Sequence, residues 1–134
     1  MGMYTCFLLS CKVKREYNSY IQKLVDGEVE WVDLVQDLPF LERFVNLPRH
    51  TFIPFGGMTA YNEDKFGEHF VNFESYISHL SFLCDLKNYD DEIETFIEDV
   101  LPHICDNVYI CVYWYEEWDE PKVLTEKDIL RKEV

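Results

Sequence analysis

Residues 78–101, SHLSFLCDLKNYDDEIETFIEDVL, change their hydrophobic period near Lys87. Before that lysine, apolar side chains fill every second position, which predicts a β-strand; they are Leu80, Phe82, Cys84 and Leu86. After it, they recur at i, i+3, i+4, i+7 and i+8, which predicts an amphipathic helix; they are Ile93, Phe96, Ile97, Val100 and Leu101. Asn88 is a suitable N-cap for this helix, and Pro102 is expected beyond its last turn.

The segments on either side repeat this pairing of strand and helix. Residues 107–118, NVYICVYWYEEW, are apolar at odd and even positions alike, which predicts a strand buried on both faces. Residues 3–13, MYTCFLLSCKV, predict another such strand, and residues 15–27 predict a helix that a glycine ends. Residues 69–77, HFVNFESYI, predict a short strand beside the alternating one.

The resulting order of elements is β-α-β-β-α-β. This order predicts an α+β domain, specifically a ferredoxin-like sandwich with its helices on one face of an antiparallel sheet. Residues 28–48 add a helical insertion in two pieces, with Pro39 in the first turn of the second. Residues 49–68 predict irregular backbone, and residues 122–134 a short returning strand and a polar tail. At 134 residues, we expect a single acidic domain spanning 1–134.

The composition limits the partners that this chain can bind. Its 26 acidic and 12 basic residues give a net charge of -14, which disfavours direct binding to nucleic acid or an anionic membrane and favours a basic partner. The five cysteines have no regular spacing, so we expect reduced, mostly buried thiols in a cytoplasmic protein. The first residues lack the features of a signal peptide or a membrane span.

No pattern in the sequence predicts catalysis, a metal or a cofactor. The chain has neither a GxGxxG nor a Walker motif, and its histidines and cysteines lack the spacing of a zinc site. His79 stands in a single His-x-Ser motif, whereas two-histidine phosphoesterases need two, so it is interpreted as an exposed strand residue. Glu116 and Glu117 would point to opposite faces of a strand and make a poor acid–base pair. We therefore expect a protein that is not an enzyme.

Carboxylates are concentrated in residues 85–120, where twelve acids stand against Lys87 alone and give a local charge of -11. Like charges at i and i+4 of the predicted helix cost about 0.2–0.5 kcal/mol per pair, so a merely solvated face remains an alternative. The other interpretation is a binding face that imitates the phosphates of DNA, with tryptophans as anchors. Its predicted residues are Asp91, Glu94, Glu98, Asp99, Trp114, Glu116, Glu117, Trp118, Asp119 and Glu120.

Residues 82–124 also carry a sequence pattern, in which LKNYDDEIETFIEDVLPHI is followed by YWYEEWDEPKVL. This pattern resembles small proteins of bacteriophages and other mobile elements, in which an acidic helix precedes a Tyr-Glu-Glu strand that ends before a proline. The resemblance implies a phage setting and brings no catalytic residue or cofactor. Small acidic phage proteins include anti-CRISPR and anti-restriction inhibitors. We therefore expect an inhibitor of host defence that acts in the host cytoplasm on a basic, nucleic-acid-binding protein.

Other functions fit the same sequence. A toxin-immunity protein that binds a nuclease toxin would also be small, acidic and rich in aromatic residues. From a different class, a small-ligand sponge or enzyme could use a pocket near residues 52–61, FIPFGGMTAY. A homodimer also stays open.

Overall fold

The computed structural model describes residues 3–57 and 66–130 and is a mixed helix and strand fold built on one antiparallel sheet. The strand order is β2-β3-β1-β4-β5, with β1 in the centre, paired to β3 and β4. The strands are β1 (Thr5–Val13), β2 (Phe70–Glu74), β3 (His79–Leu86), β4 (Cys105–Tyr115) and β5 (Lys122–Val123). The α+β prediction is confirmed, and β5 is the short returning strand that the sequence indicated.

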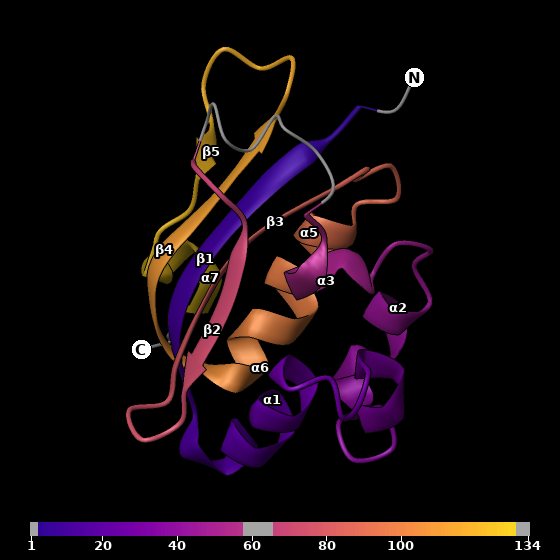
Figure 1. The fold of residues 1–134 in the computed structure, drawn as a ribbon, viewed down its shortest axis with the longest axis vertical. Coiled ribbons are helices and arrows are strands. Elements are labelled where there is room, and N and C mark those ends of the chain that lie inside the picture. Colours follow the sequence, from indigo (N-terminus) through magenta and orange to yellow (C-terminus); the bar gives the residue numbers. More distant parts are fainter. Residues whose placement is uncertain (1–2, 58–65, 131–134) are drawn as a thin grey trace.

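The helical segments lie mainly on one side of this sheet, where Figure 1 shows α1, α2, α3 and the helix from α5 to α6. They are η1 (Arg15–Tyr17), α1 (Asn18–Val25), η2 (Trp31–Leu34), η3 (Pro39–Leu41), α2 (Glu42–Val45), α3 (Phe52–Phe55), α5 (Glu92–Thr95), η4 (Phe96–Val100), α6 (Leu101–Ile104) and α7 (Glu126–Leu130). The expected insertion at 28–48 is helical in two pieces, and Pro39 begins the second. In the stretch expected to be irregular, α3 is a short helical segment interrupted at Ile53, whose backbone is extended (φ -105°, ψ 116°).

The core lies between the sheet and the helices. Alternate residues of β1 face inward from Phe7 to Val13, because successive side chains of a strand point to opposite faces. Phe96 is fully buried at the centre of this layer. Its ring contacts the rings of Phe7 and Phe82 from the sheet, and those of Trp31 and Phe44 from the insertion. The insertion therefore completes the core.

The helix predicted at 88–101 has different ends in the structure. Helical structure runs without a break through α5, η4 and α6, from 92 to 104, so the expectation that it ends before Pro102 is wrong. Proline has no N–H to donate, and its ring clashes with the carbonyl of residue i-4. The π-helical turn η4, immediately before Leu101, widens the helix at this point and admits the proline.

The N-terminal end of this helix also differs from the prediction. Asp91, in the left-handed region with φ 59°, is the N-cap, so the assignment of Asn88 as the cap residue is wrong. Asn88 still serves the first turn, because its side-chain oxygen accepts a hydrogen bond from the backbone N–H of Ile93 at 2.8 Å. An asparagine oxygen near the first turn satisfies a donor that the helix itself leaves unpaired.

Candidate partner-binding site

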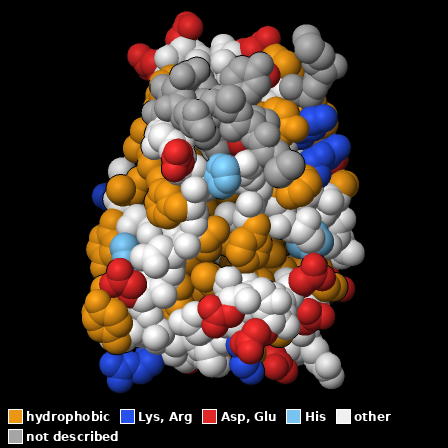
Figure 2. Space-filling view, in the orientation of Figure 1, with side chains coloured by type: hydrophobic (Ala, Val, Ile, Leu, Met, Phe, Trp, Pro, Cys, Tyr) orange, Lys and Arg blue, Asp and Glu red, His pale blue; other side chains and the backbone are white. Residues whose placement is uncertain are grey.

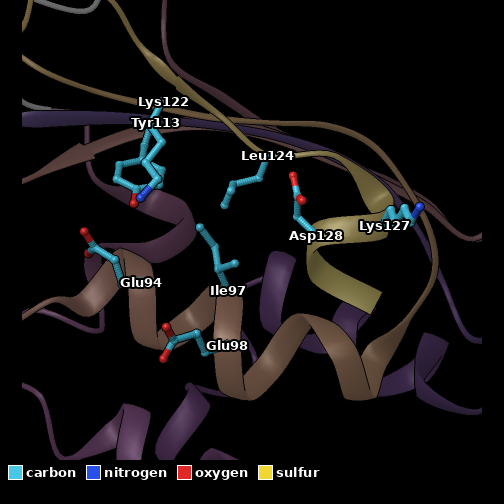
Figure 3. Close-up of a pocket in the computed structure, with 8 residues that line it drawn as sticks. All are labelled: Glu94, Ile97, Glu98, Tyr113, Lys122, Leu124, Lys127 and Asp128. Carbon is cyan, nitrogen blue, oxygen red and sulfur yellow. The ribbon is translucent and has the colours of Figure 1, made fainter. Parts of the chain in front are cut away.

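An open groove lies between η4 and the C-terminal part of the chain (Figure 3). Its volume is about 590 Å³, and apolar side chains of Ile97 and Leu124 lie between charged ones. Figure 3 shows Glu94 and Glu98 on the helix, with Tyr113 and Lys122 across from them. The residues that line it are Glu94, Ile97, Glu98, Tyr113, Lys122, Leu124, Lys127 and Asp128. We call this cavity the groove.

Tyr113 and Glu94 form the polar centre of the groove. Burial raises the pKa of Tyr113, and the charge of Glu94 and a hydrogen bond to it raise the pKa further. The amide of Asn88 donates a second hydrogen bond to Glu94 at 2.6 Å. The phenol therefore stays protonated at neutral pH, and Glu94 is held as an acceptor. This pair suits recognition of a donor group better than proton transfer, which needs a pKa near the working pH.

The turn that follows β4 places an aromatic side chain beside the groove. Residues 116–121 form this turn, which we call the hairpin loop. The indole of Trp114, at the end of β4, donates a hydrogen bond to the carbonyl oxygen of Trp118 in the loop at 2.8 Å. The ring of Trp118 lies 6.0 Å from that of Tyr113 and 5.9 Å from that of Tyr115, measured between centroids. Even so, 42% of Trp118 remains exposed. The hairpin loop thus holds an indole in place without burying it.

Acidic residues flank Trp118 in the sequence. Glu117, Asp119 and Glu120 are all exposed, and none of them forms an ion pair within residues 3–57 and 66–130. Partial burial, followed by the charges of Glu117 and Glu116, raises the pKa of Tyr115. The sequence-based expectation that Glu116 and Glu117 belong to a strand is wrong, because β4 ends at Tyr115 and both lie in the turn. The hairpin loop therefore combines negative charge with an anchored aromatic ring.

The acids of the helix have a different environment. Asp99 accepts two hydrogen bonds from Arg43, at 2.8 and 2.9 Å, and Glu98 lies 3.6 Å from the same guanidinium. Asp90 and Glu92 pair with Arg49, at 3.2 and 3.7 Å. Both arginines come from the part of the chain around the insertion, more than forty positions away in sequence. Two arginines therefore offset part of the negative charge of the helix.

The predicted binding residues consequently fall into separate groups. Asp91 caps the helix, Glu94 and Glu98 line the groove, and Asp99 pairs with Arg43. The remaining six lie at the end of β4 and in the hairpin loop; they are Trp114, Glu116, Glu117, Trp118, Asp119 and Glu120.

The sequence analysis did not identify several residues of this site. Tyr113 lies in the strand predicted to be buried on both faces, and its ring is indeed buried. Lys122, Lys127 and Asp128 come from a segment described only as a strand and a polar tail. The pattern Thr125-x-x-Asp128 is a local signal for a helix start that could have predicted α7 and the position of Asp128 in it.

Other kinds of site receive less support from the described residues. In this part of the chain, no group of three or more His, Cys, Asp or Glu side chains is arranged to hold a metal ion. All five cysteines are free and buried, as expected from the sequence. The pocket anticipated near 52–61 falls partly outside the described residues. Phe52 and Gly56 line a cavity of about 270 Å³, and Phe55 lines another of about 170 Å³.

Among the described helices, none has both the length and the apolar character needed to cross a bilayer. No family model, curated protein or solved structure matches this chain.

Proposed function

We propose that this protein is a phage-type inhibitor of a host nucleic-acid-directed defence system, of the anti-CRISPR kind, and that it binds a basic protein partner without chemistry. The observation that carries the proposal is the hairpin loop, in which Trp118 is exposed yet held by Trp114 and two tyrosine rings among acidic side chains. Aromatic anchors that are fixed before binding lose little conformational entropy when a partner arrives.

The groove beside the hairpin loop extends this surface. A lysine or arginine of the partner would find Glu94 and Glu98 on the helix side, and its aliphatic stem would pack on Ile97 and Leu124. The hairpin carboxylates would form ion pairs with basic side chains of the partner that otherwise bind the phosphates of DNA. In this sense the protein would act as a DNA mimic. The net charge of -14 would speed the encounter at low ionic strength.

We further propose that the domain is a ferredoxin-like sandwich with one strand added. The antiparallel order β2-β3-β1-β4, helical connections after β1 and after β3, and helices on one sheet face support this assignment. In that description β5 is an addition to the edge of the sheet. The hairpin loop, which holds the proposed partner-binding residues, connects β5 to β4.

Affinity capture from a lysate of the bacterial host, followed by mass spectrometry, tests the proposed function. The expected partner is a basic nucleic-acid-binding defence protein, and duplex DNA should compete with its capture. Trp118→Ala should weaken the complex about tenfold or more, as expected for an aromatic anchor. Capture of a secreted nuclease toxin would favour the immunity-protein alternative instead.

A matched pair of variants separates the local surface from overall charge. Glu117→Gln with Glu120→Gln removes two charges from the hairpin loop, whereas Glu16→Gln with Glu28→Gln removes two exposed charges elsewhere. The first double variant should weaken the complex at low salt, and the second should leave it nearly unchanged. Equal effects would show that only net charge matters and would contradict the proposal.

A further inference from the structure

Another open cavity lies at the far end of the central strand from the hairpin loop. Thr5 of β1 pairs with Tyr115, next to the hairpin loop, whereas Lys12 at the other end pairs with His79 and Asn107. The cavity has a volume of about 510 Å³. It is lined by Lys12, Arg15, Tyr76, Ile77, Ser78, Asp106 and Tyr109. We call it the basic cavity.

Positive charge distinguishes the basic cavity in this acidic chain. Lys12 and Arg15 are both exposed, and Figure 2 shows Lys and Arg side chains gathered at the lower left, near the turn between β2 and β3 in Figure 1. Within residues 3–57 and 66–130, ion pairs are formed by Arg43 and Arg49, and by no other lysine or arginine. Lys12 and Arg15 are therefore available to an external anion.

A β-bulge brings an aromatic ring to the same place. Ser10 pairs with Ile110 but Cys11 pairs with Val108, so Tyr109 is the extra residue of β4. Such a bulge redirects the side chain and is frequent next to functional sites. Tyr109 is 60% exposed, and its ring centroid lies 6.0 Å from that of His79.

The turn between β2 and β3 supplies a second ring. Ser78 adopts a left-handed conformation with φ 56°, and its carbonyl oxygen accepts a hydrogen bond from the N–H of Val13 at 2.7 Å. The side-chain amide of Asn18 also holds this turn, through the carbonyl oxygen of Ser75 at 3.0 Å. The turn is thus tied to β1 and to α1. It presents Tyr76, which is 82% exposed, at the edge of the basic cavity.

Polar groups continue the site along the outer face of the sheet. The hydroxyl of Ser10 and Nε2 of His79 are hydrogen-bonded at 2.8 Å. His79 is the direct neighbour of Lys12 on β3. A hydroxyl and an imidazole beside two cations add hydrogen-bonding capacity for phosphate or sugar oxygens.

We propose that the basic cavity binds a nucleoside phosphate. Lys12 and Arg15 hold the phosphate group, and the base stacks on the ring of Tyr109 with Tyr76 at its edge. Asp106, which also lines the cavity, accepts hydrogen bonds from the sugar hydroxyls in this proposal. Planar bases stack on aromatic side chains and phosphates pair with Lys and Arg, so one ligand satisfies both halves of the site. The net charge of -14 repels long polyanions, which favours a mononucleotide over RNA.

Isothermal titration of the whole protein with AMP at low ionic strength tests this proposal. AMP should bind saturably, and Lys12→Ala with Arg15→Ala should weaken its Kd about tenfold or more. Tyr109→Ala should weaken it by about the same factor through lost stacking. The control, Lys122→Ala with Lys127→Ala, removes two charges from the groove and should leave the Kd unchanged. An equal loss in the control, or no binding of AMP, would overturn the proposal.

Two further measurements use the unmodified protein and do not depend on any variant. Inorganic phosphate and adenosine, titrated separately, should each bind more weakly than AMP; phosphate binding as tightly as AMP would reduce the site to a general anion site. Amide chemical shifts in an AMP titration should change around Lys12, Arg15, Tyr76 and Tyr109. Changes confined to the groove would refute the assignment.

Because this site and the hairpin loop are separate, Lys12→Ala with Arg15→Ala should leave partner capture intact.

Discussion

The helix at 92–104 and the hairpin loop at 116–121 are both dense in carboxylates in the sequence, yet they fold into opposite environments. In and beside the helix, Asp90, Glu92, Glu98 and Asp99 pair with two arginines. In the hairpin loop, exposed acids flank the partly exposed Trp118 in the sequence. Most carboxylates of the helix region therefore pair with arginines of the same molecule, whereas Glu117, Asp119 and Glu120 form no ion pair within the described residues.

This difference shows why local charge counts mislead. Arg43 and Arg49 lie 56 and 41 positions from Asp99 and Asp90, so no window of sequence around the helix contains them. A surface cannot be called acidic until its distant neighbours are known. Of the two regions, the hairpin loop is the one whose acids have no arginine partner among the described residues.

The largest expected difference between the two regions is the loss of folding stability when an aromatic side chain is removed from each. Phe96→Ala should lower the free energy of unfolding by about 3–5 kcal/mol, because it opens a cavity among four aromatic rings. Trp118→Ala should cost much less, since 42% of that residue stays exposed in the folded protein. Urea unfolding of the two variants measures both values. Similar losses would mean that the hairpin loop is part of the core.

The second prediction concerns Glu92, the one acid of the helix that is fully buried. Its carboxylate accepts hydrogen bonds from the backbone N–H groups of Arg49 and Asp90, both at 3.1 Å, and lies 3.7 Å from the guanidinium of Arg49. Glu92→Ala removes the partner of these donors and should destabilise the protein by about 3 kcal/mol.

Its control is Glu120→Ala in the hairpin loop, where the same chemical change should alter the free energy of unfolding by less than about 0.5 kcal/mol. Chemical denaturation of both variants gives the comparison. A loss below about 1 kcal/mol for Glu92→Ala would contradict a structural role for this carboxylate.

The sequence predicted the elements of this fold better than their interactions. The alternation at 80–86 and the helical spacing at 93–101 are local properties of a strand and a helix, and both were recognised. The π turn before Pro102, the bulge at Tyr109 and the pairing of Arg43 with Asp99 depend on residues that meet only after folding. The groove was missed for the same reason, because it joins the helix to a segment some thirty residues later.

The third prediction concerns the free energy by which an arginine pair stabilises the helix region. Arg43 and Asp99 form a bidentate pair at the surface, where water weakens it. A double-mutant cycle with Arg43→Ala and Asp99→Ala should give a coupling energy of about 0.2–1 kcal/mol that falls as salt is added. A coupling energy of zero at low salt would leave the helix charge effectively unbalanced and would restore the acidic-face interpretation.

The fourth prediction is that charge reversal in the hairpin loop hardly affects folding. Asp119→Lys should change the free energy of unfolding by less than about 0.5 kcal/mol, because the side chain is exposed and packs against nothing in the core. Thermal unfolding at low and high salt checks this value. A loss above about 2 kcal/mol would show that the loop supports the fold and is not a free binding surface.

The smallest effect belongs to Asp128, a carboxylate whose partners are local. Its side chain accepts hydrogen bonds from the backbone N–H and the hydroxyl of Thr125, at 2.9 and 3.0 Å, and these bonds lower its pKa. A folded-state pKa below the unfolded value adds stability above the unfolded pKa, and this stability is lost as the pH falls through the folded value. The stability difference between wild type and Asp128→Asn should therefore shrink between pH 7 and about pH 3.

Thr125→Val removes the hydroxyl donor, so an NMR titration should find a higher pKa for Asp128 in that variant than in wild type. Unlike the ion pairs of the helix, this interaction joins residues three positions apart, so the sequence itself contains its pattern. A higher pKa of Asp128 in the Thr125 variant would confirm that local capping patterns predict structure more reliably than charge counts do.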